Sequence, residues 1–349
     1  MNYYLFKQKA SHTLKNPISF WLFCVIILLI LLISIGGITR LTESGLSITE
    51  WIPLTGIFYP LSNSAWLIEF EKYKVIPEYI VMNSGMSLSE FKVIYFWEWF
   101  HRFVARILGL VFFIPFIYFI IKKKFSEREK IILSIALVIG ICQAGVGWYM
   151  VQSGLVDNIN VSQYRLALHL SLAFIILGLL VFTLITRVSN YQSKNKPTNT
   201  ILRISSAIIF ALVSLQIILG AFVSGTRSGL SYNTWPLMDG DLIPNNLFII
   251  EKWYINFFEN PVTIQFDHRV IAYLLFIIVI MQYIYIHNLF RGKEYHLSSI
   301  LLSTVLFLQI VIGIMTLVYQ VHIFLGLLHQ IGAVFLFVIA LRHLYISNH

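Results

Sequence analysis

Four histidines recur as two pairs, and they are the residues of this chain best suited to chemistry. His101 and His169 form the first pair, and His268 and His329 form the second. Neutral imidazole binds transition metals and haem iron, and an ionisable residue within an apolar span is a functional candidate by default. Two imidazoles that face each other across a helical bundle can hold the iron of a flat macrocycle between them. A single histidine of this kind more often bonds between helices, but the paired recurrence favours ligation.

The elements that must position these histidines are membrane-spanning helices. Hydrophobic residues make up 58% of the 349 residues and charged residues 12%, and the mean hydropathy is +0.79, which is too apolar for a soluble protein of this length. Runs of about 20 apolar residues predict helices that cross the bilayer. The eight expected spans are residues 18–36, 103–121, 131–151, 166–185, 204–223, 270–286, 297–319 and 323–341. The predicted fold class is an all-α integral membrane protein.

Basic residues set the predicted orientation of these spans. The segments on the side of the N-terminus hold most of the lysines and arginines, and their acidic residues are Glu127, Glu129 and Glu294. Because positive charge stays inside, both termini are expected in the cytoplasm, with the long loops 37–97 and 224–267 outside. The net charge of +9 then reflects this bias and attraction to anionic lipid. We expect no nucleic-acid partner.

The chain contains an internal duplication. Residues 36–51 read GGITRLTESGLSITEW, and residues 220–235 read GAFVSGTRSGLSYNTW. The Ser-Gly-Leu-Ser run and a tryptophan recur there, and the histidine–arginine dipeptide and the last histidine of each copy recur further along. Each copy holds four spans, an even number, so the copies share one orientation about an axis along the membrane normal. The sequence predicts two parallel, pseudo-twofold-related four-helix bundles, residues 1–186 and 187–349.

Polar residues beside the histidines differ between the two copies. Arg102 and Arg269 directly follow a histidine in each half; each could pair with haem propionates through charge-assisted hydrogen bonds, or could snorkel to the interface. Glu98 lies one turn before His101, whereas Gln265 occupies that place in the second half. A carboxylate there could move protons or stabilise positive charge on an oxidised substrate carbon. Alternatively, it is a solvated acid at a helix start.

Several other features favour structural roles. The pattern Gln-x-x-x-Gly begins at Gln143, Gln216 and Gln309 and favours close helix packing around a bulky cofactor. His322 lies seven residues before His329 on one helical face and competes with it as a ligand, but its counterpart in the first half is Ser162, so we expect it at the interface or behind the ligand. The remaining histidines have no repeat partner and are interpreted as structural: His12, His287, His296, His343 and His349.

Five stretches together resemble the haem A synthase family. They are GGITRLTESGLSITEWIPLTG from residue 36, EWFHR at 98–102, SGLSYNTWPLMDGDLIP at 228–244, FDHR at 266–269 and LGLLHQ at 325–330. The resemblance runs through all eight predicted spans. It implies oxidation of the C8 methyl group of haem O to the formyl group of haem A, by two successive hydroxylations and loss of water. The product would serve haem-copper terminal oxidases.

The resemblance also implies different roles for the two halves. The N-terminal half would handle the substrate haem, and the C-terminal half would hold a haem b cofactor. The residues expected on the substrate side are Glu98, His101, His169 and, as a propionate partner, Arg102; those expected to bind haem b are His268, His329 and Arg269. Expected partners are haem O, a haem O synthase as its donor, an unidentified electron acceptor and the lipid bilayer. The resemblance leaves room for a homo-oligomer.

The positions of the cysteines indicate which branch of that family this chain resembles. Many bacterial members carry a cysteine pair in an outer loop, but loops 37–97 and 224–267 contain no cysteine, as in the branch of alphaproteobacteria and mitochondria. Cys24 and Cys142 lie inside predicted spans, so no disulfide is expected. The basic N-terminus is too short for a typical cleavable presequence, which favours a bacterial plasma (inner) membrane.

Two other classes of protein would use parts of the same pattern. A di-haem b-type electron-transfer cytochrome would use the same four histidines, but it would gain nothing from a carboxylate on one side only. A transporter with parallel repeats would need a polar site near the bilayer midplane. The polar residues of this chain are instead expected near the outer ends of their spans.

Overall fold

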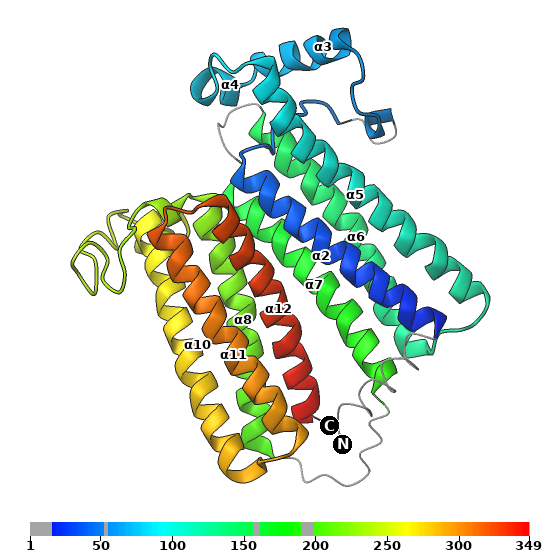
Figure 1. The fold of residues 1–349 in the computed structure, drawn as a ribbon, viewed down its shortest axis with the longest axis vertical. Coiled ribbons are helices and arrows are strands. Elements are labelled where there is room, and N and C mark those ends of the chain that lie inside the picture. The colour runs from blue at the N-terminus through cyan, green and yellow to red at the C-terminus, as the bar shows by residue number, and fades with distance from the viewer. Residues whose placement is uncertain (1–15, 52–54, 156–160, 190–198, 349) are drawn as a thin grey trace. The chain divides into compact units, whose positions relative to one another are not determined.

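The computed structural model describes residues 16–51, 55–155, 161–189 and 199–348, and these residues form helices and loops without a β-strand. Eight of the described helices are long and apolar enough to cross a membrane (Figure 1). They are α2 (Pro17–Leu41), α5 (Leu88–Ile121), α6 (Glu127–Gly154), α7 (Gln163–Val188), α8 (Thr200–Gly225), α10 (Pro261–Phe290), α11 (Glu294–Val318) and α12 (Ile323–Asn348). The expected all-α membrane class and its eight spans are confirmed.

Several helices extend beyond their apolar runs because capping residues decide where they begin. The Ser87 side chain accepts from the backbone N–H of Glu90, and the Glu90 carboxylate accepts from the N–H of Ser87, so α5 starts at a capping box. Likewise, Asn260 caps α10 ahead of Pro261. The helices that carry the spans expected at 103–121 and 270–286 therefore begin earlier, at Leu88 and Pro261. The 34 residues of α5 span about 50 Å, so its first turns extend beyond a hydrocarbon layer of about 30 Å.

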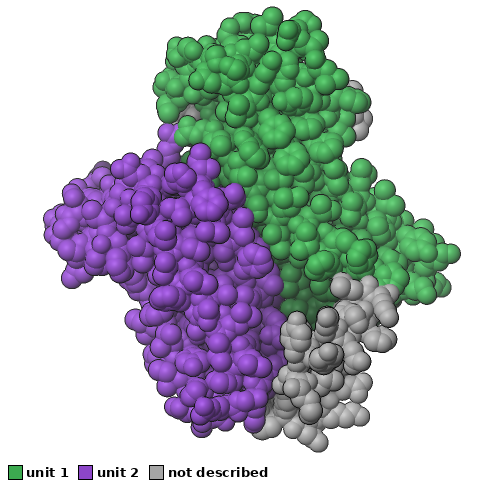
Figure 2. Space-filling model, in the orientation of Figure 1, with its two compact units in different colours: residues 1–161, 172–190 green, residues 162–171, 191–349 purple. Residues whose placement is uncertain are grey.

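Unit 1 comprises residues 1–161 and 172–190 (Figure 2, green). Within it, α2 packs along α5, and α5 contacts α6. The C-terminal end of α7 is joined to the start of α6, where Arg187 forms an ion pair with Glu129 and the Arg128 guanidinium lies 5.2 Å from the ring centroid of Phe182. These contacts connect the four long helices of the N-terminal half in chain order, apart from the first turns of α7.

The segment between α2 and α5 contains a small helical layer of its own. It contains η1 (Thr55–Ile57), α3 (Asn63–Lys74) and α4 (Pro77–Met82), and α3 packs on the extended start of α5. The aromatic residues that fill this contact are Trp66, Phe70, Tyr73, Phe91 and Tyr95. Burial raises the pKa of the Tyr73 phenol, whose hydroxyl donates to Glu78. The first three turns of α5 thus have a core outside the expected span.

Unit 2 comprises residues 162–171 and 191–349 (Figure 2, purple). Its four long helices form a closed bundle, in which α8 contacts α10, α10 contacts α11, α11 contacts α12, and α12 contacts α8. The loop between α8 and α10 carries η2 (Ser228–Leu230), η3 (Trp253–Ile255) and α9 (Asn256–Glu259). The first turns of α7 group with this unit. The division of roles at residues 186 and 187, and the pseudo-twofold relation, stay predictions.

A buried polar cluster joins all four helices of this bundle near the C-terminal end of α12. Gln282 of α10 donates to Ser205 Oγ and Ser206 Oγ of α8 at 2.7 and 2.9 Å. Its Oε1 lies 3.1 Å from Nε2 of His343 on α12, and His343 Nδ1 lies 3.0 Å from Ser298 Oγ on α11. Because an amide oxygen only accepts, Nε2 of His343 carries the proton and Nδ1 accepts from Ser298. His343 is therefore structural, as expected, and completes a four-helix network.

Unit 1 has an aromatic cluster at the corresponding part of its repeat. Pro115 lies inside α5 and has no N–H to offer the carbonyl of Val111, four residues earlier. The indole N–H of Trp21, on α2, donates to that carbonyl at 2.8 Å. The Trp21 ring also packs on Phe112 and Phe119, with centroids 5.5 and 5.7 Å apart. A side chain of α2 thus satisfies the acceptor that the proline leaves open.

Candidate functional site

His268 and His329 face each other within unit 2. They come from α10 and α12, which stand diagonally across the bundle between α8 and α11. Their ring centroids are 6.5 Å apart, and the ring planes are inclined by 73°. Two metal–imidazole bonds of about 2 Å each and a ring radius of about 1 Å on either side give a centroid separation of about 6 Å. The pair predicted from the repeat therefore has the spacing of two ligands to one metal.

The polar atoms around this pair fit a macrocycle better than a bare metal ion. Nδ1 of His268 and Nδ1 of His329 are both buried without a hydrogen-bond partner, which is a costly state for a purely structural residue. Among the described residues, no group of three or more His, Cys, Asp or Glu side chains could hold a metal ion. A haem needs only two axial ligands from the protein, because the macrocycle supplies the rest. The residues present thus fit a haem.

Glycines provide the space in which three of the four histidine rings lie. Each of these rings is directed at a glycine of a neighbouring helix. The pairs, with the distance from an added Cβ to the imidazole Cε1, are Gly36 with His101 at 3.1 Å, Gly220 with His268 at 3.4 Å and Gly313 with His329 at 2.8 Å. The sequence predicted close packing at Gly220 and Gly313, but it did not identify the histidines as the partners. The sequence signal that could have identified this contact was the recurrence of Gly36 as Gly220 in the second repeat.

Glu98 is a buried carboxylate and not a solvated acid at a helix start. Only 3% of the residue is exposed, and it lies in the third turn of α5, three residues before His101. Its Oε2 accepts from the Ser47 hydroxyl at 2.7 Å and from the backbone N–H of Ile48 at 2.8 Å. Its Oε1 accepts from Arg102 at 2.5 Å. All these partners are donors, so both carboxylate oxygens act as acceptors.

Gln265 occupies the equivalent place in unit 2 and is equally buried, at 3% exposure. Its amide nitrogen donates to the backbone carbonyls of Ser228 at 2.8 Å and Tyr232 at 3.1 Å. Its Oε1 accepts from Arg269 at 3.3 Å. In both units, therefore, this side chain joins an arginine one turn later to the repeated Ser-Gly-Leu-Ser loop.

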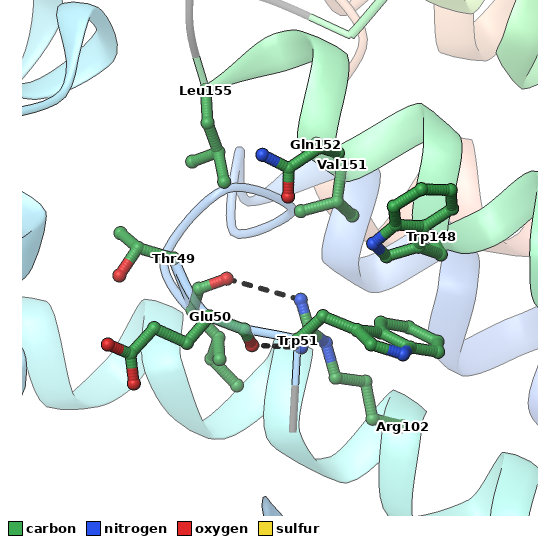
Figure 3. Close-up of a pocket in the computed structure, with 9 residues that line it drawn as sticks. Thr49, Glu50, Trp51, Arg102, Trp148, Val151, Gln152 and Leu155 are labelled. Atoms are coloured by element: carbon green, nitrogen blue, oxygen red, sulfur yellow. Dashed lines mark hydrogen bonds between the residues drawn. The ribbon is translucent and has the colours of Figure 1, made fainter. Parts of the chain in front are cut away.

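Arg102 lies in a narrow recess at the outer end of unit 1 (Figure 3). Its guanidinium donates to the backbone carbonyls of Ile48 at 3.2 Å and Glu50 at 3.3 Å. Trp51 and Trp148 also line this recess, and the Arg102 guanidinium lies 6.0 Å from the ring centroid of Trp51. The side chain is turned into the loop, so the alternative of an arginine that only snorkels to water does not apply. Its pairing with a propionate stays a prediction.

Arg269 adjoins a larger space. It donates to the backbone carbonyls of Tyr232 at 3.1 Å and Leu237 at 3.5 Å, and its Nε is buried without a partner. Beside it lies a cavity of about 230 Å³, lined also by Trp235 and Tyr273. Arg269 therefore retains an unused donor next to a cavity and directly after His268, which is compatible with the predicted role toward a haem.

The other expected site residues divide by unit and by exposure. His101 belongs to unit 1, whereas His169 belongs to the segment that groups with unit 2, so their pairing stays a prediction. His322 is exposed and precedes α12, which begins at Ile323. The His322 carbonyl accepts from the backbone N–H of Gly326 at 2.9 Å, so His322 caps the start of α12, and its expected place at the interface or behind the ligand stays a prediction. Cys24 and Cys142 are free and lie within α2 and α6, as expected.

Comparison with known proteins gives the family. Residues 19–341 match the family model described as "Cytochrome oxidase assembly protein". The chain is 45% identical to the heme A synthase of Nitrosospira multiformis, over 96% of this chain and 94% of that protein. It is 44% identical to the heme A synthase of Parvibaculum lavamentivorans, over 97% and 96% of the two chains, and 45% identical to that of Wolbachia pipientis subsp. Culex pipiens, over 92% and 95%. The chain therefore belongs to the haem A synthase family.

Proposed function

We propose that this protein oxidises the C8 methyl group of haem O to a formyl group and so forms haem A for haem-copper terminal oxidases. The observation that carries the proposal is the facing pair His268 and His329, 6.5 Å apart between centroids, in a chain whose full-length relatives are named heme A synthase. The reaction comprises two hydroxylations of the methyl carbon followed by loss of water. In each hydroxylation a C–H bond of the methyl carbon is replaced by a bond to an oxygen from water, and the two protons and two electrons released must leave, the electrons to an acceptor.

The C-terminal half would hold a haem b cofactor. His268 and His329 would be its axial ligands, and Arg269 would bind a propionate with the donor that it has free. A haem held there would carry electrons between the substrate side and an external acceptor. The protein's contribution is to fix the two rings, through the glycines against which they lie, and to keep water from them through burial.

The N-terminal half would handle haem O. His101 and His169 would bind the substrate iron, Arg102 would bind a propionate, and Glu98 would act on the reacting carbon. Glu98 lies on the same helix as His101 and one turn away. As an ionised group in a buried site, it could stabilise positive charge that develops on the substrate or take up a proton. The contrast with Gln265 supports this role, because Gln265 joins Arg269 to its loop with a neutral side chain.

The proposed setting is a bacterial inner membrane with both termini in the cytoplasm. The eight apolar helices and the bacterial relatives support a multi-pass membrane protein, and the distribution of basic residues supports this orientation. Haem O would come from a haem O synthase in the same membrane, because both substrate and product are too apolar to cross water freely.

Pigment analysis tests the proposed reaction. The full chain is expressed in cells that make haem O but no haem A, and extracted haems are separated by chromatography. We expect haem A to appear with the wild-type chain and to be absent with a vector control. The alternative is a di-haem b-type electron-transfer cytochrome, which would yield only haem B and haem O while the protein carries two redox-active b-type haems. That result would contradict the proposal.

A further inference from the structure

We propose that Gln216 and Gln309 are positioning residues, which set the height and orientation of the two histidines that would bind haem b. The inference rests on the proposed function, because it takes His268 and His329 as the ligands. It concerns the Gln-x-x-x-Gly pattern, which the proposed reaction leaves without a role. Its basis is a contact that recurs at both histidines.

Each glutamine is bonded to the backbone of a histidine on the facing helix. Nε2 of Gln216, on α8, donates to the main-chain carbonyl of His268, on α10, at 2.8 Å. Nε2 of Gln309, on α11, donates to the main-chain carbonyl of His329, on α12, at 2.8 Å. In an apolar interior no water competes for these groups. The two bonds therefore resist sliding and rotation of α10 and α12 at the level of the ligands.

The glycine of each pattern provides a place for the ring of the same histidine. Residues four apart lie on one face of a helix, so amide and glycine are directed at the same neighbour. An added Cβ at Gly220 would lie 3.4 Å from Cε1 of His268, and one at Gly313 would lie 2.8 Å from Cε1 of His329. The first is an ordinary contact, whereas the second would force the ring to move. The glutamine thus fixes the backbone and the glycine admits the imidazole.

The contact between α11 and α12 is reciprocal. His329 of α12 fills the space at Gly313 of α11, and Gln309 of α11 fills a space at Gly332 of α12. A Cβ at Gly332 would lie 2.1 Å from Oε1 of Gln309, so a larger residue there would displace the glutamine. A polar side chain of each helix therefore fills the space at a glycine of the other helix. These two contacts fix the position of His329 along α12.

The first repeat offers an internal contrast. Leu32 stands where Gln216 stands in the second repeat, since both precede by four residues the glycine that opens the repeated stretch. Gly36 still receives the ring of His101, at 3.1 Å from an added Cβ. At His101, which is proposed to bind the exchangeable substrate haem, the first repeat therefore keeps the glycine but has no glutamine at the position of Gln216. Gln309, by contrast, has a counterpart in the first repeat, Gln143, so of the two glutamines only Gln216 is replaced there.

The consequence for the cofactor is electronic. Ring orientation and the strength of axial ligation tune the potential and the low-spin signal of a bis-histidine haem. Gln216→Met and Gln309→Met keep the length of the side chain and remove the donor. In purified, haem-loaded protein we expect each to retain haem b, and each to shift both the largest g value of its EPR spectrum and its midpoint potential. Ser214→Ala is the matched control, because Ser214 bonds only within α8, to Phe210.

A graded pair of glycine variants gives a second readout. Gly313→Ala should shift the EPR signal clearly, whereas Gly220→Ala should leave it close to wild type, because the added Cβ meets the ring at 2.8 Å in one case and 3.4 Å in the other. Equal effects of the two alanine variants, or methionine variants that match Ser214→Ala, would overturn the positioning role. A wild-type protein without a low-spin bis-histidine signal would instead contradict the haem b site itself, and the positioning role with it.

Discussion

The ends of the two units that carry the Ser-Gly-Leu-Ser loops are built on one plan, but with a carboxylate in one and an amide in the other. In unit 1, Glu98 joins Arg102 to the repeated loop; in unit 2, Gln265 joins Arg269 to the same kind of loop. Both side chains are 3% exposed. Because a neutral amide makes this connection in unit 2, the shared plan can be built without a charge. We propose that the carboxylate of Glu98, besides meeting the donors of its own loop, acts on the substrate side.

The loops are adapted to the side chain that each one meets. Around Glu98 the loop presents donors, namely the Ser47 hydroxyl and the Ile48 N–H. Around Gln265 the loop presents the carbonyls of Ser228 and Tyr232 as acceptors. An exchange of the two side chains would thus cost part of the contact in each unit. Comparisons between variants must separate this structural cost from a loss of chemistry.

The largest expected effect tests whether the two halves hold different haems. His329→Ala should remove haem b from the purified protein, because it deletes one of the two proposed axial ligands and leaves only His268. His169→Ala should keep haem b at the wild-type ratio while haem A formation stops. The pyridine haemochrome spectrum measures haem b per protein, and chromatography measures haem A.

His322→Ala is the control for this pair. His322 is exposed and lies just before α12, so its loss should leave haem b in place. Full retention of haem b in His329→Ala together with loss in His322→Ala would make His322 the ligand. Equal loss of haem b from His169→Ala and His329→Ala would contradict the division of roles between the halves.

The next effect tests the charge directly. Glu98→Gln should retain haem b but lower the rate of haem A formation by roughly 100-fold or more, as for the loss of a group that handles protons or developing charge. An amide can still accept from Ile48 N–H, so the loop stays attached. Haem A formed per haem b, measured over time, gives the rate. Gln265→Glu is the matched comparison: it disturbs the loop of unit 2, where two carbonyls face the side chain, without changing Glu98, and it should lower the rate less than Glu98→Gln does.

Two outcomes would change this view. If Glu98→Gln forms haem A at the wild-type rate, Glu98 is a structural residue like Gln265. If Glu98→Gln and Gln265→Glu lose activity equally, the cause is the disturbed loop and not the charge. Thermal unfolding of both variants in detergent shows whether either one is destabilised.

Apolar runs predicted the number of long helices but not their ends. The span expected at 103–121 begins at Leu88, because its first turns are amphipathic and bury Phe91 and Tyr95 under α3. Hydropathy marks the part of a helix that needs lipid. A helix end that packs on another part of the protein is instead set by its cap and by tertiary contacts.

The site was predictable where the repeat marked it and unpredictable where only packing does. Recurrence of His268 and His329 predicted a facing pair, and the difference between Glu98 and Gln265 was visible in the sequence. The partners of Glu98 were not, because Ser47 is distant in sequence and its contact depends on how the loop returns to α5. The contact between each histidine and a glycine likewise needs the relative height of two helices, which no local pattern encodes.

The opposite ends of the same units differ more strongly than the ends that carry the Ser-Gly-Leu-Ser loops. Unit 2 has the polar cluster around His343, and unit 1 has the aromatic cluster around Trp21. His343→Leu should destabilise the protein by about 1–3 kcal/mol, because Ser298 and Gln282 would each keep a buried group without a partner. Thermal unfolding in detergent measures the loss. His322→Leu, at an exposed position, should change stability little; an equally small effect of His343→Leu would show that the cluster contributes nothing.

The smallest expected effect concerns the carbonyl of Val111. Trp21→Phe keeps an aromatic ring beside Phe112 and removes the indole N–H, so it should cost about 0.6 kcal/mol, the average for one such bond between membrane helices. Pro115→Ala restores an N–H that can bond to the same carbonyl within α5. After that change the Val111 carbonyl no longer depends on Trp21, so the cost of Trp21→Phe should become smaller in the Pro115→Ala background. A double-mutant cycle by thermal unfolding measures this coupling.

Strict additivity would mean that the proline and the tryptophan do not serve the same acceptor, and that the aromatic cluster holds α2 to α5 by packing alone.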